Sequence, residues 1–193
     1  MNKAVNKGKL IIFSAPSGAG KTTLVKYLMS AMDNLVFSIS ACSRKRRAGE
    51  KDGRDYYFIS VKEFKEKIKN DEFVEWEEVY SNYFYGTLRS EVQRIRNSGR
   101  HVVFDVDVKG GLNIKKIFGD DALAVFVKPP SVKALKQRLK QRATDDDREI
   151  ATRLAKAKNE LTFADQFDVI IINDDLEKAK KQTLEAVQNF LNR

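Results

Sequence analysis

Residues 10–25, Leu-Ile-Ile-Phe-Ser-Ala-Pro-Ser-Gly-Ala-Gly-Lys-Thr-Thr-Leu-Val, join an apolar strand to a loop of small residues and then to the start of a helix. Small residues let consecutive backbone N–H groups point into one concavity, and the dipole of the following helix favours an anion there. Lys21 is placed to reach the β- and γ-phosphates of a nucleotide, and the hydroxyl of Thr22 is placed to coordinate Mg²⁺. The pattern G-x-x-x-x-G-K-[ST] is matched except at its first glycine, which is Ala15 here. The segment therefore predicts a phosphate-binding loop; the alternative is a plain strand-to-helix turn with a solvated lysine.

The composition is typical of a soluble globular protein with one core and small insertions. The chain has 193 residues, of which 42% are hydrophobic and 33% charged. No run approaches the roughly 20 apolar residues of a membrane span, and the N-terminus has no secretory apolar region. The single cysteine, Cys42, cannot form an internal disulfide, and one cysteine with one histidine (His101) argues against a zinc site. We expect a cytoplasmic protein without a membrane partner, in which Cys42 and His101 are structural.

The positive charge indicates anionic partners. The formal net charge is +9, and cations gather at residues 44–47 and again across residues 133–158. Neither stretch interleaves aromatic residues as single-strand nucleic-acid binders do. Two compact clusters suit two phosphate groups better than a long groove, so we expect phosphorylated small molecules and no nucleic acid.

Strand and helix signals alternate along the chain. Near-continuous apolar runs, typical of parallel strands covered on both faces, lie at residues 10–13, 102–106, 123–127 and 167–172. Helices are expected at about 22–31, around Leu88, Val92 and Ile95 with Thr87 as the cap, and at about 176–191. The sequence predicts an α/β fold with a doubly wound parallel sheet as the phosphate-loop core.

Two segments interrupt this alternation and predict insertions. Residues 37–92 read as a mixed α/β lobe, with short strands at 37–40, 54–59 and 73–79 around a helix that opens with a Ser60-x-x-Glu63 capping box. Residues 133–158 read as two charged helices that form a lid. The core then comprises residues 1–36, 93–132 and 159–193.

A family resemblance spans nearly the whole chain. Its motifs follow the loop in one order: Ser40-Ala-Cys-Ser-Arg44-Lys-Arg-Arg47-Ala-Gly-Glu50, Gly53-Arg-Asp-Tyr56, Phe73-Val-Glu75-Trp76, Tyr85-Gly86-Thr87, Asp105-Val-Asp107, Pro129-Pro130-Ser131 and Asn173-Asp174-Asp175. Each motif is weak alone, but together and at compatible spacing they resemble guanylate kinase. The resemblance implies transfer of the γ-phosphoryl group of MgATP to GMP, in purine nucleotide metabolism.

The resemblance also implies an acceptor site in the inserted lobe. Arg44, Arg47, Tyr56 and Tyr85 correspond to the clamp for the GMP phosphate, which arginine side chains can hold bidentately. Guanine carries N1–H and 2-amino donors, so a carboxylate selects it, and Glu75 is the candidate. The remaining contacts implied are Ser40 and Thr87 near O6 and Asp107 near the exocyclic amine. Such a site should reject AMP by about 10⁴-fold.

The donor site implied by the resemblance surrounds the loop. ATP would contact Ala15, Pro16, Ser17, Gly18, Ala19, Gly20, Lys21, Thr22 and Thr23, with Asn173 and Asp174 on the adenine side. Asp105 ends an apolar strand and, with Thr22, would serve Mg²⁺, directly or through water. The attacking oxygen belongs to an ionised phosphate, so no general base is required. Charge neutralisation falls to Lys21, Arg138, Arg142 and Arg153, and we expect Lys21 to be exposed in the free protein.

Several alternatives stay open from the sequence. A catalytically inactive guanylate-kinase-like binding module, a P-loop NTPase stimulated by nucleic acid, and a kinase for another nucleotide compete with the main interpretation. The sequence leaves open whether dGMP is accepted, whether the chain forms a homodimer, what Arg46 does, and whether Tyr83 or Tyr85 meets the phosphate; we favour Tyr85 because Gly86-Thr87 follows it.

Overall fold

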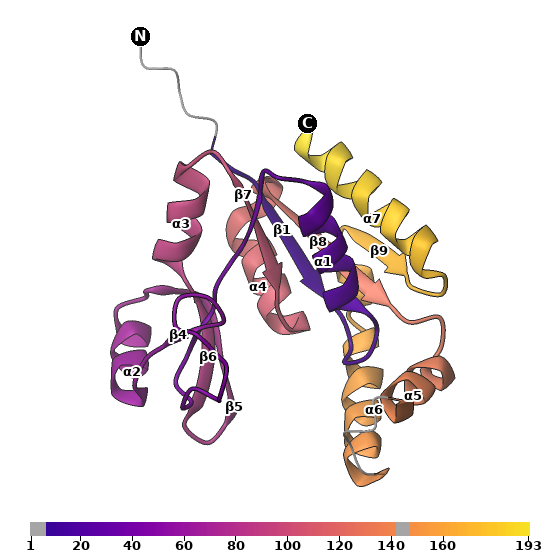
Figure 1. Ribbon diagram of the computed structural model, residues 1–193, viewed down its shortest axis with the longest axis horizontal. Helices are drawn as coiled ribbons and strands as arrows, with labels where there is room; N and C mark the ends of the chain where they lie inside the picture. Colours follow the sequence, from indigo (N-terminus) through magenta and orange to yellow (C-terminus); the bar gives the residue numbers. More distant parts are fainter. Residues whose placement is uncertain (1–6, 142–146) are drawn as a thin grey trace.

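A computed structural model, which describes residues 7–141 and 147–193, contains a parallel five-stranded core sheet (Figure 1). The predicted Arg142 lies outside these residues. The strand order is β2 (Leu35–Phe37), β7 (His101–Asp105), β1 (Leu10–Ser14), β8 (Ala122–Lys128) and β9 (Val169–Ile172). Each neighbouring pair is parallel. The predicted doubly wound α/β core is confirmed.

Alternate side chains of the central strands pack into two apolar layers, one on each face of the sheet. Ile11 and Phe13 pack with helices α1 (Lys21–Ala31) and α7 (Leu176–Leu191) on one face. Leu10 and Ile12 pack on the other face, which is covered by α3 (Arg89–Asn97) and α4 (Val108–Phe118). These side chains are fully buried, and because a strand side chain alternates between faces, one short strand serves both layers. The double layer holds the phosphate loop at the end of β1.

A second, four-stranded sheet builds the inserted lobe. Its order is β4 (Tyr57–Phe58), β3 (Ala41–Cys42), β6 (Tyr83–Leu88) and β5 (Phe73–Tyr80), and α2 (Val61–Lys69) covers it through Phe64. The prediction of a lobe strand at 37–40 is wrong: Phe37 ends β2 in the core sheet, and the lobe strand begins at Ala41. Strand β6, which pairs antiparallel with β5, was not predicted.

Helix caps follow the predictions at one helix and depart from them at another. Ser60 Oγ accepts a hydrogen bond from Glu63 N at 3.1 Å, as expected for the start of α2. Thr87 does not cap α3, because β6 runs on to Leu88, which takes the N-cap position without a side-chain bond. Thr87 instead lies opposite Glu75 in the β5–β6 ladder.

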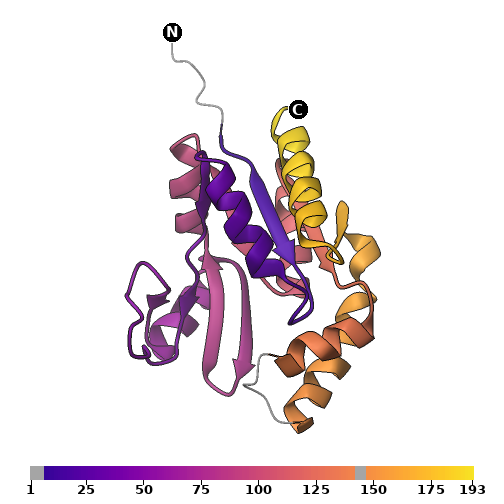
Figure 2. The same cartoon turned by 45° about the vertical axis from the view of Figure 1, so that its right-hand side comes forward.

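The lobe and a pair of helices extend from the same edge of the core sheet. Helices α5 (Val132–Gln141) and α6 (Asp147–Leu161) lie across from the β5–β6 hairpin, at the edge where the core strands end (Figure 2). Short 3₁₀ turns at Gly119–Asp121 and Ala164–Gln166 precede β8 and β9. The start of β1 and the end of α7 lie at the opposite edge (Figure 1).

Cys42 and His101 have structural surroundings. Cys42 is buried in β3, and burial raises the pKa of its thiol. His101 Nδ1 accepts from Lys9 N at 2.9 Å, and burial lowers the pKa of this imidazole. None of the helices in the described part of the chain is long and apolar enough to cross a membrane.

Candidate active site

The loop between β1 and α1 forms one wall of a cavity of about 360 Å³. Gly18 and Gly20 adopt positive φ angles of 89° and 98°, which turn the backbone around this cavity. Ala19 belongs to the same loop but is buried and does not line the cavity. The predicted loop residues that line the cavity are Ala15, Pro16, Ser17, Gly18, Gly20, Lys21, Thr22 and Thr23.

Lys21 is tied to the end of β7 instead of standing free. Its ammonium group lies 2.5 Å from Asp105 Oδ1 and donates to the carbonyl of Val106 at 2.8 Å. The expectation that Lys21 is exposed is wrong, since only 18% of its side chain is accessible. A carboxylate and a carbonyl thus hold the ammonium group at the cavity, the position from which it can meet a phosphate.

The residues predicted for Mg²⁺ supply suitable donors. Thr22 Oγ1 lies 3.4 Å from Asp105 Oδ2, so a hydroxyl and a carboxylate oxygen face one space. Mg²⁺ prefers oxygen ligands and is commonly held by one or two protein groups together with substrate phosphates. No group of three His, Cys, Asp or Glu side chains in residues 7–141 and 147–193 could hold a metal ion unaided. The donor set therefore fits an ion that arrives with a nucleotide.

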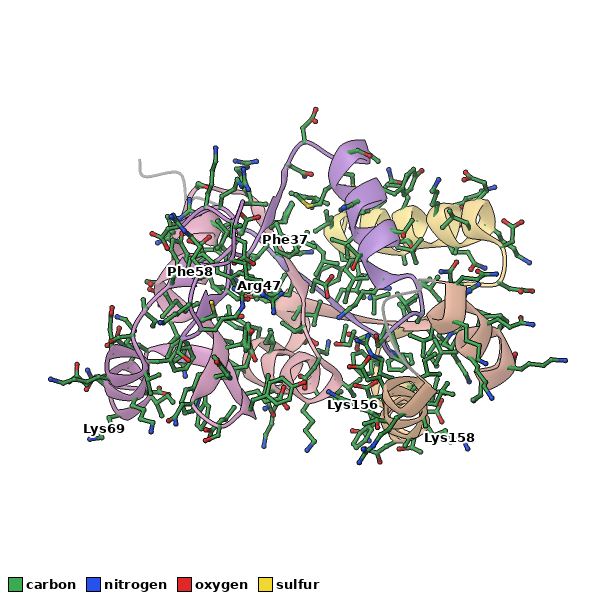
Figure 3. The ribbon with its side chains drawn as sticks, turned by 60° about the horizontal axis from the view of Figure 1, so that its bottom comes forward. Phe37, Arg47, Phe58, Lys69, Lys156 and Lys158 are labelled. Carbon is green, nitrogen blue, oxygen red and sulfur yellow. The ribbon has the colours of Figure 1, made fainter. Side chains whose placement is uncertain are left out.

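Helices α5 and α6 bring cationic side chains to the loop. Arg138 of α5 donates to the carbonyl of Asn173 at 2.8 Å, and Arg153 of α6 lies 3.4 Å from Ser17 Oγ. Lys156 and Lys158 lie on opposite sides of α6, and Lys156 is the one that lines the cavity (Figure 3). A neighbouring hollow is lined by Arg138, Gln141, Asn173 and Asp174 together with loop glycines. Arg138, Arg153, Asn173 and Asp174 thus gather where the sequence placed them.

A second cavity, of about 150 Å³, opens in the lobe. It is lined by Ser40, Tyr56, Glu75, Glu77, Tyr85, Gly86, Asp105, Val106 and Asp107. The segment from Asp105 to Asp107 also lines the loop cavity. The two cavities therefore share one wall, at the end of β7.

Glu77 is a member of this site that sequence reasoning missed. It stands two residues beyond Glu75 on β5, and the period of two in a strand places both side chains on one face. This alternation along β5 is the feature of the sequence that could have identified Glu77 as a member of the site. Burial, then the charge of Asp107, raise the pKa of Glu77.

Glu75 occupies a strongly desolvating position. Its Oε1 accepts from Thr87 Oγ1 at 2.7 Å, and a Cβ on Gly110 of α4 would lie only 3.0 Å from Oε2. Burial raises the pKa of Glu75 to about 7, although the Thr87 hydrogen bond acts in the opposite direction. Asp107 caps α4 by accepting from Gly110 N at 2.7 Å. Glu75 is therefore a partly buried carboxyl group that gains most from a ligand with hydrogen-bond donors.

Arg44 is held by the lobe on several sides. Glu50 binds it bidentately, at 2.7 Å to NH1 and 2.5 Å to NH2, and Tyr85 OH accepts from Nε at 3.1 Å. The hydrogen bond from Arg44, then that from the backbone of Arg47, lower the pKa of Glu50 to about 2. The ring of Tyr56 lies 5.1 Å from the guanidinium carbon. The structure thus brings together Arg44, Tyr56 and Tyr85, whereas Arg47 joins through its backbone N–H and has an exposed side chain.

Known proteins share this arrangement over nearly the whole chain. The family model described as guanylate kinase matches residues 7–190. The guanylate kinase of Bacteroides thetaiotaomicron is 54% identical over 186 residues, which are 96% of this chain and 91% of that protein. The guanylate kinase of Porphyromonas gingivalis is 49% identical over 184 residues, 95% and 98% of the two chains. A crystal structure of guanylate kinase from Anaplasma phagocytophilum superposes with a TM-score of 0.75 at 26% identity, covering 97% of this chain and 88% of that one. With its loop cavity and lobe cavity sharing the end of β7, this chain belongs to the guanylate kinase family.

Proposed function

We propose that this chain transfers the γ-phosphoryl group of MgATP to GMP, giving ADP and GDP. One observation carries the proposal: the loop cavity and the lobe cavity share Asp105, Val106 and Asp107 as a wall. A donor in the loop cavity and an acceptor in the lobe cavity would therefore meet, with their phosphate groups facing each other beside this shared segment. This is the arrangement that in-line phosphoryl transfer needs.

On the donor side, the phosphates of ATP bind in the loop cavity. Backbone N–H groups of Gly18, Gly20, Lys21 and Thr22 face the β-phosphate, whereas that of Ala19 stays bonded to the carbonyl of Pro16. Lys21 exchanges part of its contact with Asp105 for the phosphate oxygens. Thr22 and Asp105 would hold Mg²⁺, which would supply neutralisation of charge on the transferring group. Asp174 lines the adjacent hollow that would receive the adenosine.

On the acceptor side, GMP lies with its base toward Glu75 and its phosphate toward Arg44. The ionised Glu75 accepts from guanine N1–H and the 2-amino group, while Ser40 faces O6 and Asp107 faces the exocyclic amine. Thr87 does not line this cavity, and its hydroxyl proton is donated to Glu75, so it acts on the base through that carboxyl group. AMP presents an acceptor at N1 where guanine presents a donor, which is a strong basis for discrimination. Tyr56, Tyr85 and the side chain of Arg47 complete the phosphate clamp.

Catalysis rests on alignment and neutralisation of charge. The acceptor phosphate is already ionised, so no residue needs to remove a proton. Arg138 of α5 and Arg153 and Lys156 of α6 all lie beside the loop. Because α5 and α6 share one apolar cluster, we propose that they close over the bound nucleotides as a unit. We place the reaction in the cytoplasm, because the free Cys42 fits a reducing compartment.

A coupled assay of ADP release tests the substrate assignment. MgATP is offered with GMP, AMP, CMP or UMP in turn, with one sample lacking an acceptor and one containing RNA instead. We expect rapid turnover with GMP and at most about 10⁻⁴ of that efficiency with AMP. RNA-stimulated hydrolysis, or binding of GMP without turnover, would contradict the proposal and favour an NTPase or a binding module respectively.

A further inference from the structure

Asn173 is fixed in place immediately after β9. Its backbone N–H donates to the carbonyl of Lys128 at 2.8 Å, and its own carbonyl accepts from Arg138 NH2 at 2.8 Å. The residue is only 5% exposed. Hydrogen bonds to both backbone groups, together with burial, therefore fix the backbone from which the side chain extends.

The side chain of Asn173 donates a hydrogen bond to a backbone carbonyl group of the phosphate loop. Its Nδ2 donates to the carbonyl of Ala19 at 2.8 Å, a contact between buried groups, and Arg138 NH1 approaches the same oxygen at 3.5 Å. The amide of Asn173 packs directly against Gly20, because a Cβ added to Gly20 would lie 2.1 Å from this Nδ2. Only glycine permits the amide to reach its acceptor.

Holding this carbonyl also sets the direction of the next N–H group. In a planar trans peptide the C=O and N–H bonds point in opposite directions, and no described peptide bond is cis. With Ala19 O directed at Asn173, Gly20 N–H faces away from it. No group in the described part of the chain accepts from Gly20 N–H, and Gly20 lines the loop cavity. The Gly20 N–H group is therefore free to donate to a phosphate bound in the loop cavity.

We propose that Asn173 is a positioning residue for the phosphate-binding loop: it holds the Ala19–Gly20 peptide in the orientation that presents Gly20 N–H to a bound polyphosphate. Asn173 acts through the loop, so its effect does not depend on the base attached to the phosphates. A direct contact with adenine would depend on that base. The inference deepens the proposed function on its donor side and rests on it only for the identity of the reaction.

Binding of a polyphosphate that has no base separates the two roles. Titration calorimetry measures the affinity of the whole chain for MgATP and for magnesium tripolyphosphate, in the unchanged protein, in Asn173→Ala and in the control Asn113→Ala, whose asparagine is exposed on α4. We expect Asn173→Ala to weaken both ligands by the same factor, about tenfold, the scale of one buried hydrogen bond. The control should bind both ligands as the unchanged protein does.

Asn173→Leu keeps the approximate size of the side chain and removes the amide donor without adding a charge, so it covers the case in which the alanine variant does not fold. It should show the same equal loss, and in the coupled assay KM for MgATP should rise while KM for GMP stays constant. Loss of MgATP affinity with unchanged tripolyphosphate affinity would overturn the proposal in favour of an adenine contact. Unchanged affinity for both ligands would overturn it as well. If the unchanged protein binds both polyphosphates but does not phosphorylate GMP, the proposed function fails and this inference stands.

Discussion

Raising the pH from 6 to 8 should tighten the binding of GMP, because Glu75 must be ionised to accept from guanine. Burial raises the pKa of this carboxyl group to about 7. The ionised fraction then rises from about 0.1 at pH 6 to about 0.9 at pH 8, and apparent affinity scales with the competent fraction, which gives about a tenfold gain. Glu75→Gln removes the titration and should bind GMP weakly at both pH values.

Titration calorimetry at pH 6, 7 and 8 measures this gain. The GMP phosphate also titrates, with a second pKa near 6, and the Glu75→Gln variant reports that contribution alone. Glu77, whose pKa burial also raises, and Asp107 face the same cavity, so Glu77→Gln serves as a second control. If the unchanged protein and Glu75→Gln show the same pH dependence, the assignment of Glu75 as the reader of guanine is refuted.

The same carboxyl group makes folding stability depend on pH. Because its pKa is raised from 4.5 to about 7 in the folded protein, the folded state holds the proton more tightly than the unfolded state. The associated stability is present below pH 4.5 and is lost as the pH rises through 7, with an upper limit of about 3 kcal/mol. Urea unfolding at pH 5 and pH 8 should show a smaller loss for Glu75→Gln than for the unchanged protein.

Three further substitutions follow from contacts at the site. Lys21→Met should lower kcat by about 100-fold or more in the coupled assay, and a near-normal kcat would contradict the role of the ammonium group. The thermal midpoint should change little, because the partner Asp105 stays partly exposed. Thr87→Val removes a hydrogen bond that lowers the pKa of Glu75, so the midpoint of pH-dependent GMP binding should move upward, and a downward shift would count against it. Gly20→Ala places a Cβ at a φ of 98°, so urea unfolding should reveal a loss of about 1–3 kcal/mol, and an unchanged midpoint would show that the loop tolerates it.

Most strands of the core were predictable because their signals are local. Continuous apolar runs mark β1, β7 and β8, and the serine cap of α2 is visible as a four-residue motif. The strands that were missed or misplaced, β2 and β6, depend on partners elsewhere in the chain. Pairing of β6 with β5 also turned Thr87 from the expected helix cap into a partner of Glu75, so tertiary context overrode the local pattern.

Most members of the candidate site were predictable from the sequence, but their contacts were not. Motif order located the loop, Arg153 and the carboxyl groups of Glu75, Asp105 and Asp107 that line the two cavities, and it missed Glu77. No spacing in the sequence predicts that Lys21 pairs with Asp105, or that Asn173 bonds to Ala19 across 154 residues. Such contacts arise only when separate strands end at the same edge of the sheet.

Phosphorus NMR of a mixture of MgATP and GMP with this protein follows the transferred phosphoryl group itself. We expect the resonances of ADP and GDP to grow together as those of ATP and GMP decline, with no inorganic phosphate beyond that in a sample without protein. Inorganic phosphate released without GDP would contradict the proposed transfer, because the γ-phosphoryl group would then have passed to water and not to an acceptor held in the lobe.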